Sequence, residues 1–405
     1  IQQLCPKWSG SFEAMHGEDV VKYLVGVCAA LGNLPLDRLE TEKGILRTEA
    51  AGRQGGVGDS MPLWRYGARD YGLVSYDELG LSRLSADDVR NWAATRFTRQ
   101  NAVLWITSDQ VPTGLRLHLP EGPRQPVPRP SSALPITPAY FTERTNGVVF
   151  DAVVQRRTVA SVFSAVLERE MYRSLRQEGG YSYVASTSYD PRGDGFATVT
   201  AFADALPDKQ DAVLGGFVDL LAKLRVGRIE QADLDSVRVK AEESLRHEEY
   251  DAARLPMAAM NVLTGHPNLA AEAFLDEVRD VTVDDVQAVA VEASGSALLL
   301  VPAGLNAEWA GYVPAPTCST TSISGERYAS RQSDKVALVV GAEGVSVADA
   351  SHAITVRYQE CAVALAWPDG GRQLIGHDGI AVRVEPTLYD VPAGLIARID
   401  AGVSP

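Results

Sequence analysis

Apolar residues recur at helical spacing in two similar pairs of segments. The first pair covers residues 19–31 and 36–50, and the second pair covers residues 210–224 and 233–245. Within each segment the apolar positions fall three and four residues apart, which is typical of a helix that buries one face. The pattern therefore predicts two helix pairs that lie far apart along the chain.

Each predicted helix pair is followed by the same short phrase and then by an apolar run. The phrases are LSADDV at 84–89 and VTVDDV at 281–286, and the apolar runs lie at 102–106 and 297–301. Ser or Thr followed three residues later by Asp marks the start of a helix, and each apolar run indicates a strand. Because order, capping residues and final strand agree, the sequence predicts a duplicated domain.

The second copy contains a stretch for which the first copy has no counterpart. Its patterns predict a strand at 148–154, a helix at 159–176 that ends at a Gly-Gly pair, and a strand at 181–189. A return strand at 196–202 follows. This order of elements is typical of an α+β layer whose sheet is covered by helices on one face.

The first copy matches only the return strand of this stretch, at residues 9–15. It lacks the opening strand, the first helix and the next strand. A sheet without them would expose its apolar face to water, which folded domains avoid. We therefore expect a further segment to precede residue 1 in the natural protein.

Composition divides the chain into five parts. An incomplete first repeat covers 1–109, a Pro-rich linker covers 110–140, the second repeat covers 141–303 and a connector covers 304–333. The last part, 334–405, holds short alternating strands and a final helix. This pattern favours a small barrel-like module, similar to a pleckstrin-homology fold.

Charge and cysteine usage exclude several classes of function. The formal net charge is −14, and no basic patch offsets it, so nucleic acid and anionic membranes are disfavoured as partners. No apolar run approaches the roughly 18 residues of a membrane span. The four cysteines show no CxxC spacing, which favours reduced thiols in a cytoplasmic protein.

Two carboxylates on the second predicted helix are candidates for chemistry. Glu42 and Glu49 are seven residues apart, so both lie on one face of the helix, about 10.5 Å apart along its axis. Leu39 and Leu46 share that stripe, and a carboxylate on an apolar stripe is costly unless it is paired or bound to a metal. The alternative is a solvated helix edge, with Lys43 close by.

An Arg-Tyr pair near the Gly-Gly stop is the second candidate. Arg176 falls in the last turn of its predicted helix, and Tyr183 falls on the strand that follows. A tight return can bring both side chains to one end of the sheet, where they could donate hydrogen bonds to a carbonyl or an oxyanion. In the alternative, Arg176 neutralises the helix C-terminus and Tyr183 is an ordinary strand aromatic.

With these motifs on a duplicated α+β frame, the chain resembles the pitrilysin/insulinase-type zinc peptidases, the inverzincins, in their short two-domain bacterial form. The resemblance covers residues 1–303 and rests on ETEKGILRTE at 40–49 and LRQEGGYSY at 175–183. It implies a zinc cofactor, with Glu49 as the third zinc ligand and Glu42 as its outer partner. It also implies that Arg176 and Tyr183 contact the substrate from a domain that faces the zinc.

The chain departs from the family at one essential motif. The HxxEH that supplies two zinc ligands and the general base would lie on the helix that the first copy lacks, and none of the six histidines has that spacing. Either the motif precedes residue 1 in the natural protein, or the chain is a non-catalytic subunit. The retained Glu42 and Glu49 favour the first possibility.

The resemblance implies a zinc-dependent endopeptidase, or a subunit of one, that cleaves unfolded or short peptides inside a chamber. A homodimer, or a heterodimer with a related peptidase subunit, would form the chamber, and the peptide would bind as an added strand. Arg176 and Tyr183 would polarise the scissile carbonyl from across the dimer. Alternatively, the chain is a non-catalytic partner that supplies this pair or only binds peptide, or it is a structural core-type subunit.

Overall fold

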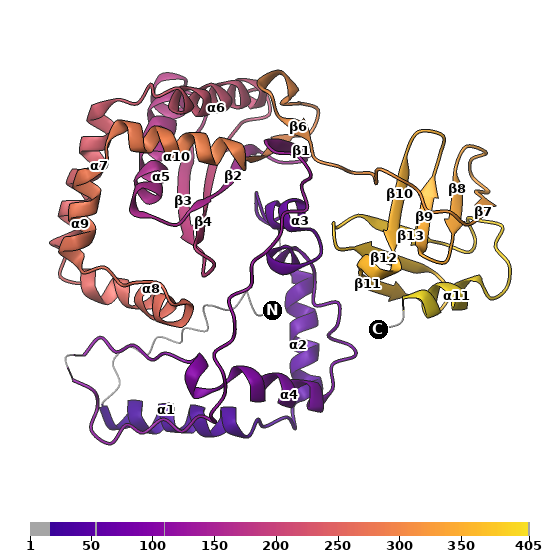
Figure 1. The fold of residues 1–405 in the computed structure, drawn as a ribbon, viewed down its shortest axis with the longest axis horizontal. Helices are drawn as coiled ribbons and strands as arrows, with labels where there is room; N and C mark the ends of the chain where they lie inside the picture. The colour runs from indigo at the N-terminus through magenta and orange to yellow at the C-terminus, as the bar shows by residue number, and fades with distance from the viewer. Residues whose placement is uncertain (1–16, 53–54, 109, 404–405) are drawn as a thin grey trace.

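The computed structural model describes residues 17–52, 55–108 and 110–403. The fold is α+β, as the sequence predicts. Along the chain, a helical N-terminal part is followed by a central part built on a sheet and by a β-rich C-terminal module (Figure 1). No helix in the described ranges is both long enough and apolar enough to cross a membrane.

A mixed six-stranded sheet forms the central part, in the order β3-β4-β2-β5-β1-β6. β1 runs parallel to β5 and β6, and the other neighbours are antiparallel. β3 therefore lies at one edge of the sheet and pairs only with β4 among the described strands. The strands are β1 (Ala139–Glu143), β2 (Gly147–Gln155), β3 (Ala185–Pro191), β4 (Phe196–Asp204), β5 (Leu298–Pro302) and β6 (Val313–Pro314).

Helices cover one face of this sheet. α5, α6 and α10 pack on the strands, and α7 and α9 pack against α5 (Figure 1). Their largest fully buried side chains include Phe163 and Phe217, which meet Phe150 of β2, and burying each aromatic ring contributes about 1.5–3 kcal/mol. The helices are α5 (Thr158–Met171), α6 (Gln210–Arg225), α7 (Gln231–Leu245), α9 (Ala271–Asp280) and α10 (Val283–Gly295), with α8 (Tyr250–Thr264) between α7 and α9.

A smaller apolar core covers the second face of the sheet. Successive residues of a strand point to opposite faces, so Phe150 joins the helical core while Val149 joins a smaller core on the other side. Helix α3 (Met61–Tyr66) supplies Met61 to this smaller core, and its Trp64 stacks on Phe141 of β1 at 4.8 Å between ring centroids. The N-terminal part of the chain thus completes the sandwich around the sheet of the second repeat.

The described residues between 17 and 108 form helices and turns but no strand. The predicted strand at 102–106 is therefore wrong. Its counterpart, β5, forms ladders with β1 and β2, but no described strand of the first repeat lies beside 102–106 to supply such hydrogen bonds. The predicted strand at 9–15 lies outside the described residues. The helices here are α1 (Gly17–Gly32), α2 (Leu39–Gly52), α3 and α4 (Ala86–Arg96).

The capping phrases of the two repeats fold in the same way. Ser85 caps α4 and Thr282 caps α10, and each hydroxyl accepts a hydrogen bond from a backbone amide three residues later, at 3.2 Å. The side chains of Asp88 and Asp285 accept hydrogen bonds from the cap amides in return, at 2.8 and 2.9 Å. The repeated phrase therefore forms a reciprocal capping box in both copies.

The helix predicted at 159–176 ends differently from the prediction. α5 stops at Met171, and a π-helical turn, Tyr172–Glu178, extends it. Gly180 then adopts a φ of +61°, which glycine tolerates best, and the chain reverses. The next strand begins at Ala185 rather than at residue 181, so Tyr183 lies on a loop and not on a strand.

The C-terminal module consists of two antiparallel sheets and helix α11 (Leu395–Gly402). The sheets have the orders β10-β9-β8-β7 and β11-β12-β13, and they share one apolar core with α11. The final helix that the sequence predicts in this part is α11. The strands are β7 (Glu326–Ala329), β8 (Ala337–Val340), β9 (Gly344–Ala348), β10 (Ala353–Arg357), β11 (Cys361–Ala366), β12 (Arg372–Gly376) and β13 (Ala381–Val384).

A buried ion pair joins α3 to the sheet. Arg65 is only 3% exposed, and its Nε donates to the carboxylate of Asp151 on β2. Its two terminal nitrogens donate to the backbone oxygens of Asp151 at 2.7 Å and of Ser296 at 2.9 Å. Each of the three guanidinium nitrogens thereby donates a hydrogen bond inside the protein, and α3 cannot leave the sheet without exposing both charges.

Removing the arginine of this pair should destabilise the protein strongly. Arg65→Met leaves Asp151 buried without a cation, and such a loss costs about 3–5 kcal/mol. Urea unfolding measures the change. The matched control is Arg90→Met, because Arg90 forms an exposed pair with Asp87 on α4 that should contribute less than about 1 kcal/mol. Equal effects of the two substitutions would contradict this account.

Candidate functional site

The structure places the predicted acidic pair in solvent. Glu42 and Glu49 are both exposed on α2, and Glu42 pairs with Arg38 one turn earlier, at 3.1 Å. The buried polar residue of α2 is instead Lys43, whose ammonium donates to Glu40 at 2.8 Å and to the backbone oxygen of Leu84 at 3.0 Å. This arrangement corresponds to the solvated helix edge that the spacing also allowed.

The described residues do not fit zinc as they stand. A catalytic zinc needs three protein ligands, and no group of three or more His, Cys, Asp or Glu side chains within the described ranges could hold a metal ion. Glu49 alone supplies one carboxylate. Its role as a zinc ligand, and that of Glu42 as its partner, stay predictions.

The second predicted pair does come together. The guanidinium carbon of Arg176 lies 5.8 Å from the ring centroid of Tyr183 and 5.0 Å from that of Tyr172. Both distances are within the range of a cation–π interaction. The cation contacts two aromatic rings at the point where the π-helical turn leads back to the sheet.

This cluster stands at an open pocket of about 600 Å³. Tyr183 is 81% exposed at the pocket, and Val184 and Ala185 extend the lining to the first residue of edge strand β3. Among the described residues, the lining includes none from α2. The lining residues are Glu168, Arg169, Tyr172, Arg173, Arg176, Gln177, Tyr183, Val184, Ala185, Asp233 and Lys240.

One carboxylate fixes the loop that carries Tyr183. Asp204 is the last residue of β4, and its Oδ1 accepts three hydrogen bonds of 2.7 Å, from the Ser182 hydroxyl and from the backbone amides of Tyr183 and Val184. These bonds replace the strand ladder that the sequence predicted from residue 181. Burial by itself raises the pKa of Asp204, but the three donors outweigh it and hold the pKa below its usual 3.8.

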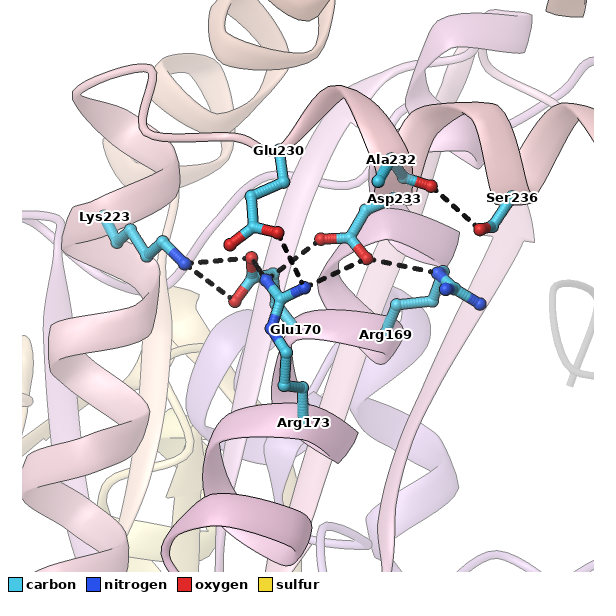
Figure 2. A network of polar contacts seen from close by, with 8 residues as sticks. All are labelled: Arg169, Glu170, Arg173, Lys223, Glu230, Ala232, Asp233 and Ser236. Atoms are coloured by element: carbon cyan, nitrogen blue, oxygen red, sulfur yellow. Dashed lines mark hydrogen bonds and ion pairs between the residues drawn. The ribbon is translucent and has the colours of Figure 1, made fainter.

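A polar network adjoins the pocket and shares Arg169, Arg173 and Asp233 with its lining (Figure 2). Its centre is Glu170 of α5, only 1% exposed, which accepts hydrogen bonds from Lys223 of α6 at 3.0 and 3.1 Å and also pairs with Arg173. Arg173 lies 3.0 Å from buried Asp233 of α7 and 3.2 Å from Glu230. Three helices are joined by charges that would be costly to separate in the interior.

Burial and ion pairing have opposite effects on the pKa values of this network. Burial raises the pKa of Glu170, and the hydrogen bonds and charges of Lys223 and Arg173 limit the rise. Burial by itself lowers the pKa of Arg173, but Glu170 and Asp233 outweigh it and raise the pKa. Arg169 also contacts Asp233, at 3.4 Å. Arg173 and Lys223, the cations nearest the core, are therefore paired with the buried carboxylates of Glu170 and Asp233.

Comparison with known proteins identifies the fold. No family model matches the sequence, and no curated protein matches it. A protease from Helicobacter pylori has a TM-score of 0.56 at 16% identity, over 70% of this chain and 77% of its own. A peptidase M16 inactive domain from Pseudomonas fluorescens has a TM-score of 0.55 at 15% identity, over 70% and 74%.

The first half of the periplasmic protease PqqL from Escherichia coli gives a similar result. Its TM-score is 0.53 at 11% identity, over 73% of this chain and 72% of its own. The chain thus shares its fold with M16-like peptidase domains, one of which is described as inactive. Because the fold occurs in both kinds of domain, it does not decide between a catalytic and a non-catalytic role.

Sequence reasoning missed three residues of the site. Tyr172 lies four residues before Arg176, one helical turn, and that spacing could have drawn attention to it. Asp204 and Lys240 had no such signal, since they reach the site from β4 and α7. Only the tertiary packing of those elements brings Lys240 into the pocket lining and Asp204 against the loop of Tyr183.

The hydrogen bonds of Asp204 predict a specific pH dependence. Its depressed pKa means that its contribution to stability is complete above the unfolded pKa, near 3.8, and is lost as the pH falls through the lower folded pKa. Asp204→Ala should therefore be less stable than the wild type by about 1–3 kcal/mol at pH 7, and the difference should shrink below pH 4.

Urea unfolding at a series of pH values measures this difference. Asp208→Ala is the matched control, because Asp208 is exposed on the next turn of the chain. A deficit of Asp204→Ala that is independent of pH would show that packing, and not the charged hydrogen bonds, is responsible. Hydrogen exchange of the amides of residues 183 and 184 should rise in the same variant.

Proposed function

We propose that this chain is a subunit of a pitrilysin-type peptidase that binds an extended peptide and presents Arg176 and Tyr183 to its backbone. The observation that carries the proposal is the meeting of this pair at an open pocket beside edge strand β3. The fold supports it, because it is shared with M16-like peptidase domains.

Edge strand β3 offers a template for a peptide. One side of Ala185–Pro191 pairs with β4, and no other described strand covers the opposite side. On that open side the amide of Thr187 donates to Glu168 at 3.3 Å. The remaining unpaired amides and carbonyls of such an edge can bind an extended chain by strand addition. A peptide added there would run past the loop that carries Tyr183.

The pair has suitable chemistry for a peptide carbonyl. The Arg176 guanidinium and the Tyr183 hydroxyl are both donors, and a carbonyl oxygen or an oxyanion accepts from such groups. Donors held in advance of binding stabilise developing negative charge without reorganising. The stacking on Tyr172 and the anchoring by Asp204 provide that order here.

Replacing the arginine should weaken peptide binding. Arg176→Ala should raise the Kd for a fluorescent, unstructured, uncharged peptide with an amidated C-terminus by about tenfold, which is about 1.4 kcal/mol. Fluorescence anisotropy measures the Kd. Arg327→Ala is the control, since Arg327 is an exposed arginine on β7. If Arg176→Ala binds the peptide as tightly as wild type, the proposal fails.

A second candidate function is a zinc-dependent endopeptidase that acts in the chamber of a dimer, and the motif at Glu42 and Glu49 favours it. Metal analysis of the natural full-length protein separates the two. About one zinc per chain, reduced by Glu49→Ala, would support the catalytic form. Absence of zinc, with peptide binding retained, would support a non-catalytic subunit of a homodimer or heterodimer.

A further inference from the structure

Two cations of the pocket have no carboxylate partner. Four cations line it, and two of them, Arg169 and Arg173, form ion pairs with Asp233. No ion pair involves Arg176 or Lys240 within the described part of the chain, and Arg176 contacts only aromatic rings through its cation. Both side chains are exposed, so both are available to a ligand.

The pocket is positive on an acidic protein. Its lining carries four cations and two carboxylates, Glu168 and Asp233, which leaves two positive charges in excess. The charged groups behind the lining, Glu170, Glu230, Lys223 and Asp204, together balance this excess, so the positive charge lies in the lining itself. The whole chain has a net charge of −14, so a pocket lining with two excess cations is contrary to the average surface.

We infer that the pocket binds a carboxylate of the peptide, held between Arg176 and Lys240. The inference rests on the proposed function and names its specificity. The carboxylate could belong to an acidic side chain or to the free C-terminus, because both present the same group. Lys240 is then a specificity-determining residue that sequence reasoning did not identify.

The geometry supports a carboxylate rather than a neutral group. An arginine fork matches the two oxygens of a carboxylate, and a lysine adds a compact charge that can approach either oxygen. Lys240 and Asp233 lie two turns apart on α7, so both face the pocket from the same side of the helix. Asp233 is already occupied by Arg169 and Arg173, and it therefore does not neutralise Lys240.

The test uses one unstructured fluorescent sequence in three forms. The first is uncharged and amidated, the second carries a single Glu moved along the amidated sequence, and the third is uncharged with a free C-terminus. We expect the wild type to bind an acidic form about tenfold more tightly than the neutral form. A preference for the second form identifies a side chain, and a preference for the third identifies the C-terminus.

Lys240 is tested by two substitutions. Lys240→Gln should remove most of the acidic preference, so that the acidic and neutral forms bind with nearly the same Kd, while Lys240→Glu should reverse the preference. Lys209→Gln is the matched control, because Lys209 is an exposed lysine of the same domain outside the pocket lining. A thermal melt confirms that each variant is folded.

The outcomes separate this inference from the function on which it rests. If the neutral peptide binds and Arg176→Ala weakens it, but acidic forms bind no more tightly, only the carboxylate site is overturned. A full acidic preference in Lys240→Gln would overturn the role of Lys240. If no form of the peptide binds the wild type, the proposed function and this inference fail together.

Discussion

The buried carboxylate of Glu170 determines how charge is distributed around the candidate site. A carboxylate with almost no contact with water must be paired, and Lys223 and Arg173 reach it from two elements. Arg173 is shared with Asp233 of α7, so one network joins α5, α6 and α7 (Figure 2). Arg176, in the π-helical turn that follows α5, has no carboxylate partner among the described residues and lines the pocket.

Contacts at the edge of the sheet and on its far face hold the candidate site in place. Asp204 holds the loop of Tyr183, and Tyr172 stacks on Arg176, so the donors are positioned before any peptide arrives. On the far face of the sheet, Arg65 connects the N-terminal helices to Asp151. The fold is that of M16-like peptidase domains, but the proposed peptide site depends on these particular side chains.

Local patterns accounted for much of the fold. The two capping phrases formed the same reciprocal bonds, and the helix pairs and the strands at 148–154 and 196–202 appeared near their predicted limits. These features depend mainly on interactions between residues that are close together in the sequence. The strand predicted at 102–106 failed because a strand also needs a partner at its side, and periodicity does not report whether one is present.

The candidate site also has a part that the sequence predicts and a part that only the tertiary structure decides. The sequence by itself determined that Arg176 and Tyr183 lie near one turn, because a short Gly-Gly reversal separates them. Tertiary structure alone decided that Glu42 and Glu49 face solvent, since exposure depends on what packs against α2. It also decided that Lys240 joins the pocket, because that contact depends on how α7 lies against α5, and side chains from separate helices carry no mutual signal in a single sequence.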